Sequence, residues 1–241
     1  MRKALLASAS ALALSCSAAE AAPPVSWTGF YVGANAGYGW GSTSPVQIFD
    51  LGPVPAGAPP NYHPNGFIGG GQAGYNWQTG MWVFGGEVDF SGLGVRGDSS
   101  LSPFFGGKGF ANTGTFSSRY DWLFTARLRG GFLVTPTWLI YVTGGLAVTQ
   151  VRDSATVQIP ETWTWTQTST LTGGTIGGGI ETMFGPNWTA RLEYLYARFK
   201  DTAPPGVIVD GPAAGTALDP TFSFNHNLNV IRFAFNYKFG S

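Results

Sequence analysis

Few residues in this chain are suited to acid–base or nucleophilic chemistry. Its 241 residues include two histidines, His63 and His226, and one cysteine, Cys16. Ser223 precedes His226 by three residues, a spacing that suggests a nucleophile and its base. In an extended strand, residues an odd number apart point to opposite faces, so these two side chains would diverge. No nucleophile motif surrounds Ser223, and we expect no enzymatic activity.

The sequence supports a metal or cofactor site as little as it supports an enzymatic one. Imidazole is a common metal ligand, but two histidines from separate loops supply too few donors for a site. We interpret His63 and His226 as solvated loop residues, and we expect no metal and no cofactor.

Charged side chains form a more informative set, because four acids and four bases occupy alternate positions in segments that are otherwise apolar. The set is Glu87, Asp89, Arg127, Arg129, Glu181, Arg191, Glu193 and Arg232. Charges removed from water are tolerated when they pair with opposite charges. We expect neighbouring segments to place Glu87 and Asp89 near Arg127 and Arg129. The remaining four should form a second group.

The segments that position these charges alternate between apolar and polar residues. In the last one, an apolar and aromatic face opposes a face with charge and amide groups. The first face holds Ile231, Phe233, Phe235, Tyr237 and Phe239; the second holds Val230, Arg232, Ala234, Asn236 and Lys238. A period of two indicates a β-strand, and about ten residues is the length that crosses a bilayer as a tilted strand.

The same period recurs in eight segments, which predicts an all-β fold: an eight-stranded antiparallel up-and-down transmembrane β-barrel. The expected strands are 28–40, 66–77, 82–90, 118–134, 138–148, 176–181, 188–196 and 229–239. Three short turns, Gln78–Gly80, Thr135–Thr137 and Gly185–Asn187, alternate with four long connections, 41–65, 91–117, 152–169 and 200–225. Short turns are periplasmic in such barrels and long loops extracellular. Within the third connection, 152–158 and 162–170 also alternate, so these strands could continue as a hairpin that exposes Trp163 and Trp165.

Composition agrees with this fold class. Only 11% of residues are charged, against about 25% in soluble domains, too few to coat a lipocalin-like soluble barrel. No apolar run is long enough for a membrane helix. With a formal charge of zero, nucleic acid is not an expected partner. Aromatic residues at strand ends should form girdles at the bilayer interfaces. They are Trp27, Trp40, Trp77, Trp82, Trp138, Trp188, Tyr237 and Phe239.

The N-terminus has the pattern of an export signal. Arg2 and Lys3 precede an apolar run, and small residues around Glu20 form a cleavage site after Ala21. We expect residues 1–21 to be a cleaved signal peptide and 22–241 to be the barrel domain, in a bacterial outer membrane. Cys16 would be removed with the signal; a lipoprotein cysteine is the alternative.

Several strand sequences resemble the alphaproteobacterial outer-membrane β-barrel family, a group of OmpA-like and opacity-like surface proteins often labelled porin family. The similar stretches are WTGFYVGANAGYGW, GGGQAGYNWQ, WVFGGEVDFSGLG, YVTGGLA, NWTARLEYLY and VIRFAFNYKF, spanning about Trp27 to Phe239. The resemblance implies one eight-stranded barrel that serves envelope integrity and surface interaction, without an enzymatic activity or a cofactor. Members usually end on the aromatic residue that the assembly machinery reads. Phe235, Tyr237 and Phe239 form this signal here, but Gly240 and Ser241 follow it.

The charged set favours a lumen closed by ion pairs, because an eight-stranded barrel is just wide enough for side chains to fill it. A narrow passive pore is the alternative, since glycines on the inner face, such as Gly33, Gly37, Gly74 and Gly177, would leave room for water. A third hypothesis is a surface adhesin or haem-binding protein acting through its loops, with Trp163 and Trp165 as an exposed patch. Expected partners are outer-membrane lipids, lipopolysaccharide, the barrel-assembly machinery and host or cell-surface ligands.

Overall fold

The computed structural model describes residues 26–47, 63–101, 113–159, 161–200, 207–210, 215 and 222–240. Its regular elements are all strands. They are β1 (Gly29–Gln47), β2 (Asn65–Thr79), β3 (Trp82–Leu93), β4 (Arg96–Leu101), β5 (Thr113–Thr135), β6 (Trp138–Ile159), β7 (Glu161–Phe184), β8 (Trp188–Lys200), β9 (Val207–Asp210) and β10 (Phe222–Lys238). Within these ranges, no helix is long and apolar enough to cross a bilayer.

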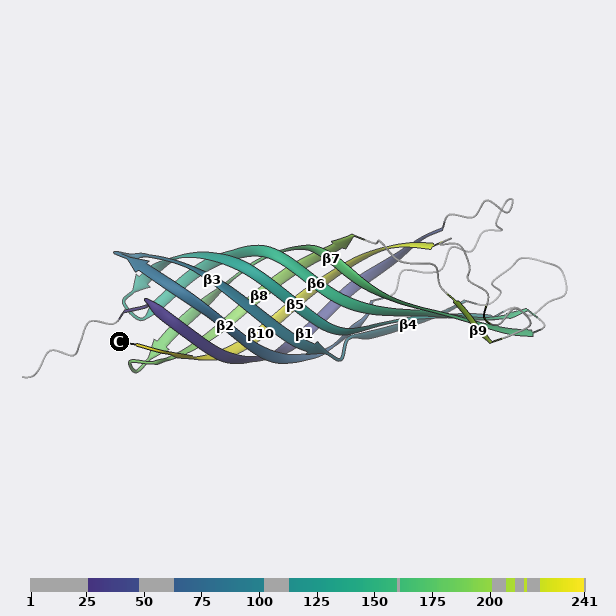
Figure 1. The fold of residues 1–241 in the computed structure, drawn as a ribbon, viewed down its shortest axis with the longest axis horizontal. Helices are drawn as coiled ribbons and strands as arrows, with labels where there is room; N and C mark the ends of the chain where they lie inside the picture. Colours follow the sequence, from purple (N-terminus) through teal and green to yellow (C-terminus); the bar gives the residue numbers. More distant parts are fainter. Residues whose placement is uncertain are drawn as a thin grey trace, which may run out of the picture.

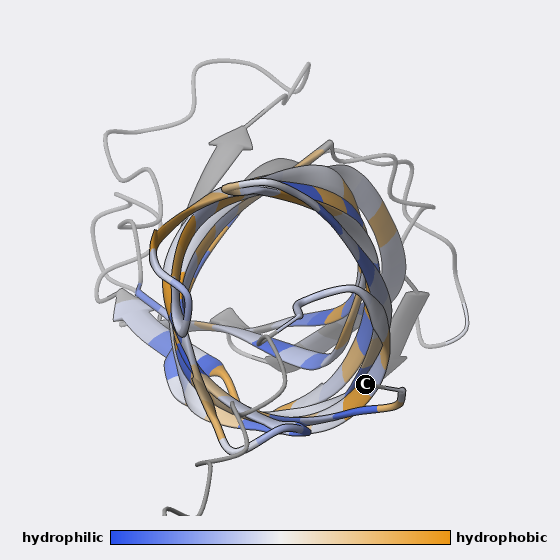
Figure 2. Cartoon of the chain, turned by 90° about the vertical axis from the view of Figure 1, so that its left-hand side faces the viewer, coloured by the Kyte–Doolittle hydropathy of each residue, from blue (hydrophilic) through white to orange (hydrophobic). Residues whose placement is uncertain are grey.

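Eight antiparallel strands close into a barrel, as the alternating pattern predicts. We call each of these eight strands, together with its extension beyond the barrel, a stave. Around the ring, β1 is followed by β10, β8, β7, β6, β5, β3 and β2, and β2 pairs with β1 to close the circle. The first and last staves are hydrogen-bonded from Tyr31 opposite Lys238 to Gln47 opposite Phe222. Figure 1 shows the tilted staves from the side, and Figure 2 shows the closed ring from one end.

Two connections predicted as loops are largely strand. β4 continues the third stave beyond Gly94 and Val95 and pairs with β5, so the 91–117 connection is shorter than predicted. The expected hairpin within 152–169 is confirmed: β6 and β7 pair without interruption up to Ile159 opposite Glu161. Thr and Trp alternate from Thr162 to Thr166, and β-branched and aromatic residues favour extended backbone. The strands therefore extend well past the barrel at one end (Figure 1).

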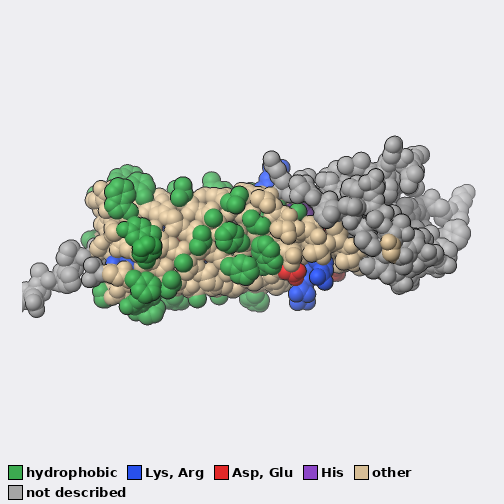
Figure 3. All heavy atoms as spheres, in the orientation of Figure 1, with side chains coloured by type: hydrophobic (Ala, Val, Ile, Leu, Met, Phe, Trp, Pro, Cys, Tyr) green, Lys and Arg blue, Asp and Glu red, His purple; other side chains and the backbone are tan. Residues whose placement is uncertain are grey.

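The outer surface of the barrel is apolar, and the predicted set of eight charged side chains lies inside it. Phe67 is 79% exposed on β2, whereas Arg232 on β10 is 1% exposed. Hydrophobic side chains cover the barrel in a broad band (Figure 3). In a soluble protein this surface would be costly, but hydrocarbon lipid removes the cost. The alternating faces predicted for the eight strands are therefore confirmed, with one exception on β5.

The exception is Asp121, which a strict period of two would place on the inner face with Thr125 and Arg127. The register of β5 shifts between Tyr120 and Trp122. Such a bulge adds one residue and reverses the side-chain alternation. Tyr120 is buried as a result, and Asp121 instead binds Arg119 at 2.8 Å, where both side chains contact solvent.

The three predicted short turns are present and join β2 to β3, β5 to β6 and β7 to β8. Gly80 has φ of +58° and Gly185 has φ of +72°. These left-handed conformations are open to glycine at little cost. The turns lie at the opposite end of the barrel from the strand extensions (Figure 1).

Candidate functional site in the barrel lumen

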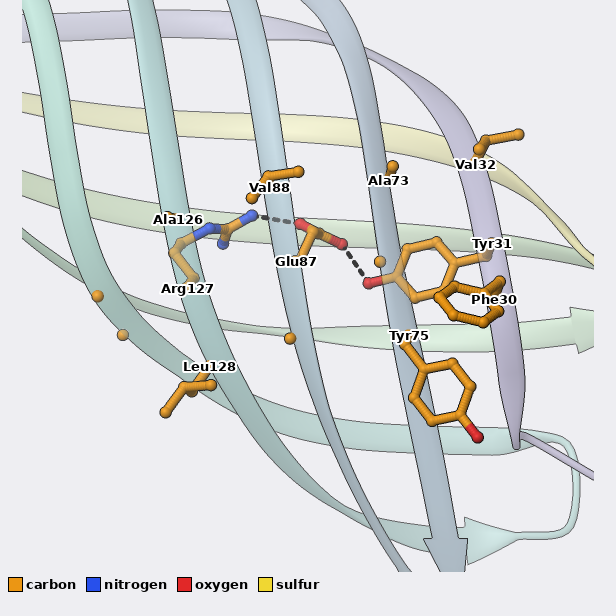
Figure 4. A pocket seen from close by; sticks show the side chains of 14 residues that line it. Phe30, Tyr31, Val32, Ala73, Tyr75, Glu87, Val88, Ala126, Arg127 and Leu128 are labelled. Atoms are coloured by element: carbon orange, nitrogen blue, oxygen red, sulfur yellow. Dashed lines mark hydrogen bonds and ion pairs between the residues drawn. The ribbon is translucent and has the colours of Figure 1, made fainter.

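Glu87 on β3 is the centre of the network that fills the lumen. Arg191 on β8 donates to both of its carboxylate oxygens, at 2.5 Å and 2.8 Å. Arg127 on β5 donates to the same carboxylate, as does the hydroxyl of Tyr31 on β1 at 2.6 Å. Figure 4 shows Tyr31 and Arg127 meeting Glu87 from two sides. One carboxylate thus joins four staves of the ring.

A second layer links Asp89 and Glu193 through two arginines. Arg127 donates to Asp89 at 3.0 Å and to Glu193 at 3.1 Å. Arg232 on β10 donates to Asp89 at 3.0 Å and to Glu193 at 2.8 Å. Each arginine therefore bridges two acids from different sides of the barrel. Because the guanidinium group of each arginine contacts more than one carboxylate, rotation of one side chain would break several bonds together.

The third group lies around Glu181 on β7. Arg129 donates to Glu181 at 2.5 Å, and Thr189 does so at 2.6 Å. The guanidinium of Arg129 also stacks over the ring of Tyr141, 4.1 Å from its centroid. The Tyr141 hydroxyl donates to Glu193 at 2.7 Å. This last bond connects the Arg129 group to the Asp89 layer.

The structure places all eight charged side chains of the predicted set inside the barrel, each no more than 5% exposed. It brings Glu87 and Asp89 to Arg127, and Glu193 to Arg232, as strand adjacency suggested. Arg129 and Arg191 depart from that scheme. Arg129 binds Glu181 from two strands away, and Arg191 binds Glu87 of the first group from the opposite side of the ring. Pairing between opposite staves could not be found from adjacency, since it depends on how the ring closes.

An apolar layer closes the lumen at the turn end. Its members are Trp27, Val83, Leu133, Leu139, Tyr141 and Met183. The prediction that Trp27 lies in an interfacial girdle is wrong: the residue is 1% exposed, and its Nε1 donates to the carbonyl of Pro136 at 3.0 Å. Its backbone N–H also binds the side chain of Gln78 at 2.8 Å. Because Trp27 precedes the first strand, the period of two did not fix its direction.

A larger apolar cluster occupies the lumen on the other side of the charges. It includes Ile68, Val95, Tyr120, Leu123, Val151, Leu171, Leu195, Phe199 and Leu228. Sequence reasoning missed this cluster, although a signal was present. Leu123 has the same parity as Thr125 and Arg127, and Leu228 has the same parity as Arg232. Two apolar layers thus enclose the ion pairs.

Glycines on the inner face do not leave room for water, contrary to the prediction. A Cβ at Gly74 would collide with the ring and hydroxyl of Tyr31. At Gly37 it would collide with the backbone of Ile231 and with Arg232. The space that these glycines vacate is filled by neighbouring side chains and closely approaching strands, which is a common use of glycine in strands.

The histidine interpretation holds for one residue only. His63 is exposed, but His226 is buried in β10, and its Nδ1 lies 3.0 Å from the hydroxyl of Tyr120. Its inward position follows from the period of two, because His226 has the parity of Arg232. The side chain of Ser223 lies outside the described residues. Among the described residues, no group of three potential ligands could hold a metal ion.

Other predicted residues lie on the exterior or outside the described part. Phe235, Tyr237 and Phe239 are exposed on the outer face, and the Phe239 N–H donates to the Phe30 carbonyl at 2.8 Å. Trp163 and Trp165 are on β7, opposite Val157 and Ala155, but their side chains lie outside the described residues. Residues 1–21, with the predicted cleavage site after Ala21, and Ser241 also lie outside them.

An open groove of about 660 Å³ lies on the outer surface between β1 and β6. Phe30, Val32, Tyr75 and Leu128 line it with side chains directed away from the Glu87 network (Figure 4). The groove therefore opens on the lipid side of the barrel wall, and residues of the network, Tyr31, Glu87 and Arg127, contribute to its floor.

Comparisons with known proteins agree with this architecture. A model of the outer membrane protein beta-barrel domain matches residues 9–239. The 31 kDa outer-membrane immunogenic protein of Brucella melitensis is 34% identical over an alignment of 243 positions. The alignment covers 92% of this chain and 89% of that protein. The 22 kDa outer membrane protein of Rhizobium leguminosarum bv. viciae is 32% identical over 178 residues, 74% of this chain and 67% of that protein.

Among solved structures, the outer membrane protease OmpT of Escherichia coli superposes with a TM-score of 0.52 at 8% identity, over 88% of this chain and 97% of that one. A likeness at this identity shows the fold alone. The family model and the two relatives carry the assignment: this chain belongs to the outer membrane protein β-barrel domain family.

Proposed function

We propose that this protein is a closed structural barrel that contributes to the integrity of the outer membrane. The observation that carries the proposal is the network of Glu87, Arg127 and Arg191, which spans the lumen from β3 to β8. A route for solutes along the barrel axis would have to pass through this network and through both apolar layers.

The energetic argument concerns the separated charges. Separating one partner of a buried ion pair costs about 3–5 kcal/mol when the other charge stays without compensation. The Glu87 carboxylate by itself pairs with three arginines, Arg127, Arg191 and Arg232, so opening a passage beside it breaks more than one such pair. A resting pore is therefore disfavoured relative to a filled barrel.

Planar-bilayer recording of the purified protein tests the proposal. A closed barrel gives no stable conductance steps, and liposomes that contain it do not swell in small sugars. Arg191→Ala should also stay closed, because the two apolar layers remain. Regular conductance steps in the wild-type protein would overturn the proposal, and an increase in Arg191→Ala would favour a gated pore.

A second candidate role is surface interaction through the strand extension. In this part, β4, β5, β6, β7 and β9 pair side by side beyond the lipid-facing band. The sheet is wide enough to present a surface to another molecule. Deleting its outer part and measuring adhesion of intact cells tests this role; unchanged adhesion would contradict it.

The proposal includes an orientation and partners. The strand extension lies on the cell exterior, and the short turns and both termini lie in the periplasm, after removal of residues 1–21. The lipid-facing band contacts membrane lipids. The assembly machinery recognises the outward residues Phe235, Tyr237 and Phe239 of the last strand. Protease protection of the turns in intact cells supports this orientation, and cleavage there would contradict it.

A further inference from the structure

Three arginines stand side by side on the outer surface where the strands leave the lipid-facing band. Arg96 on β4 is directly opposite Arg119 on β5, and Arg119 is directly opposite Arg152 on β6. Side chains at directly opposite positions of antiparallel strands share a face. All three arginines are exposed, and we refer to them as the arginine row. Exposed Thr168 on β7, opposite Arg152, continues the row with a hydroxyl group.

Such an arrangement is costly without an anion. Like charges at directly opposite positions destabilise a sheet. Among the described residues, Arg119 alone in the row has an acidic partner, Asp121 at 2.8 Å. Asp98 is exposed on the same face of β4 but makes no ion pair with a described residue. Arg96 and Arg152 therefore flank a paired arginine without carboxylates of their own in the described part.

The position of the row corresponds to the interface between lipid and water. Trp122 follows Arg119 by three residues on β5, and its ring pairs with that of Phe90 on β3, with centroids 5.8 Å apart. Arg152 follows Val148 by four residues, or about 13 Å along a tilted strand. Figure 3 shows charged side chains gathered at one edge of the hydrophobic band. Aromatic residues mark this level in membrane proteins, so the guanidinium groups lie at the depth of lipid headgroups.

Among the described residues, the exposed arginines of the outer surface lie at this end. Arg198 on β8 is the other exposed arginine among the described residues, and it too lies on the side of the strand extension. At the turn end, Lys238 is buried. The charge therefore faces one leaflet of the bilayer.

We propose that the arginine row binds the phosphate groups of a phosphorylated glycolipid in the leaflet at this end. The inference rests on the proposed orientation, in which that leaflet faces the cell exterior. Neighbouring strands are about 4.8 Å apart, so one phosphate reaches two guanidinium groups, and arginine matches phosphate geometry with two parallel hydrogen bonds. The apolar wall below the row accommodates acyl chains, which favours a lipid over free phosphate.

Titration of the purified full-length protein in neutral detergent tests the site. The probes are lipid A, chemically dephosphorylated lipid A and inorganic phosphate, with binding followed by native mass spectrometry. We expect lipid A to bind at least about tenfold more tightly than its dephosphorylated form, as loss of charge-assisted hydrogen bonds predicts. The triple variant R96Q/R119Q/R152Q should lose this preference. Arg198→Gln, the matched control, removes an exposed arginine outside the row and should retain it.

Three results would overturn the proposal: equal lipid A affinity in the triple variant, an equal loss in Arg198→Gln, or inorganic phosphate that displaces lipid A at similar concentrations. The last result would identify free phosphate as the ligand. Arg152→Gln alone, with a smaller expected loss, replaces the triple variant if the latter does not fold. Orientation is tested separately by labelling an Arg198→Cys variant, with Cys16 replaced by Ser, on intact cells with an impermeant maleimide. An unlabelled result would reject the orientation without affecting the titration.

Discussion

The guanidinium of Arg191 on β8 and the carboxylate of Glu87 on β3 are joined by two hydrogen bonds, 2.5 Å and 2.8 Å long, across the barrel. The two strands are four places apart in either direction around the ring. The bond pair therefore spans the lumen rather than a sheet edge. It connects opposite walls of the cylinder, as far apart around the ring as two of its eight strands can be.

Replacement of Glu87 by Gln should strongly destabilise the barrel. Arg127 and Arg191 would then lose a shared buried charge, and the free energy of unfolding should fall by about 3–5 kcal/mol. Urea unfolding in liposomes measures this change. Asp121→Asn breaks the exposed pair with Arg119 and should cost about 1 kcal/mol or less. Similar losses in both variants would contradict the buried network.

Two glycines of β2 should respond in opposite ways to the same substitution. Gly74→Ala places a methyl group against the hydroxyl end of Tyr31 and should cost about 1–3 kcal/mol through overpacking. Gly71→Ala points outward, where the nearest atom to its Cβ is the Gly33 carbonyl at 3.7 Å. That variant should be neutral or slightly stabilising. Chemical unfolding of both variants measures the difference, and equal costs would argue against a filled lumen.

Trp27 should be shielded from lipid because it lies inside the apolar layer at the turn end. Brominated lipids quench the fluorescence of tryptophans that contact lipid. The quenched part of the emission should therefore be the same in Trp27→Phe as in the wild-type protein. Trp82→Phe, at an exposed position on the outer face, should reduce that part. If Trp27→Phe reduced the quenched emission as much as Trp82→Phe does, Trp27 would have to face lipid.

The hairpin of β6 and β7 should be dispensable for folding of the barrel. Asp153 and Gln167 are directly opposite, so residues 154–166 can be replaced by an Asn-Gly turn that matches a two-residue hairpin. The shortened protein should keep the altered gel mobility of a folded barrel before heating, because the staves beneath keep all their partners. Loss of that mobility would show that the extension is needed for folding.

Much of the candidate site was predictable because a strand alternates its side chains strictly. The parity of Glu87, Asp89 and Arg127 places all three on the inner face once the outer face is recognised as apolar. The same rule applied to Leu123 and Leu228 would also have found the larger apolar cluster. The rule failed at Asp121, where a bulge inserts a residue, and at Trp27, which lies outside any strand.

By itself, the sequence determined the number of staves, their order along the chain and which face of each meets lipid, because these follow from local period and turn chemistry. Only the tertiary structure decided that Arg191 meets Glu87 and that Arg129 meets Glu181. Those partners are set by the curvature and stagger of the closed ring, which bring distant staves within reach of long side chains. Contacts across a lumen depend on closure as a whole, so no single segment encodes them.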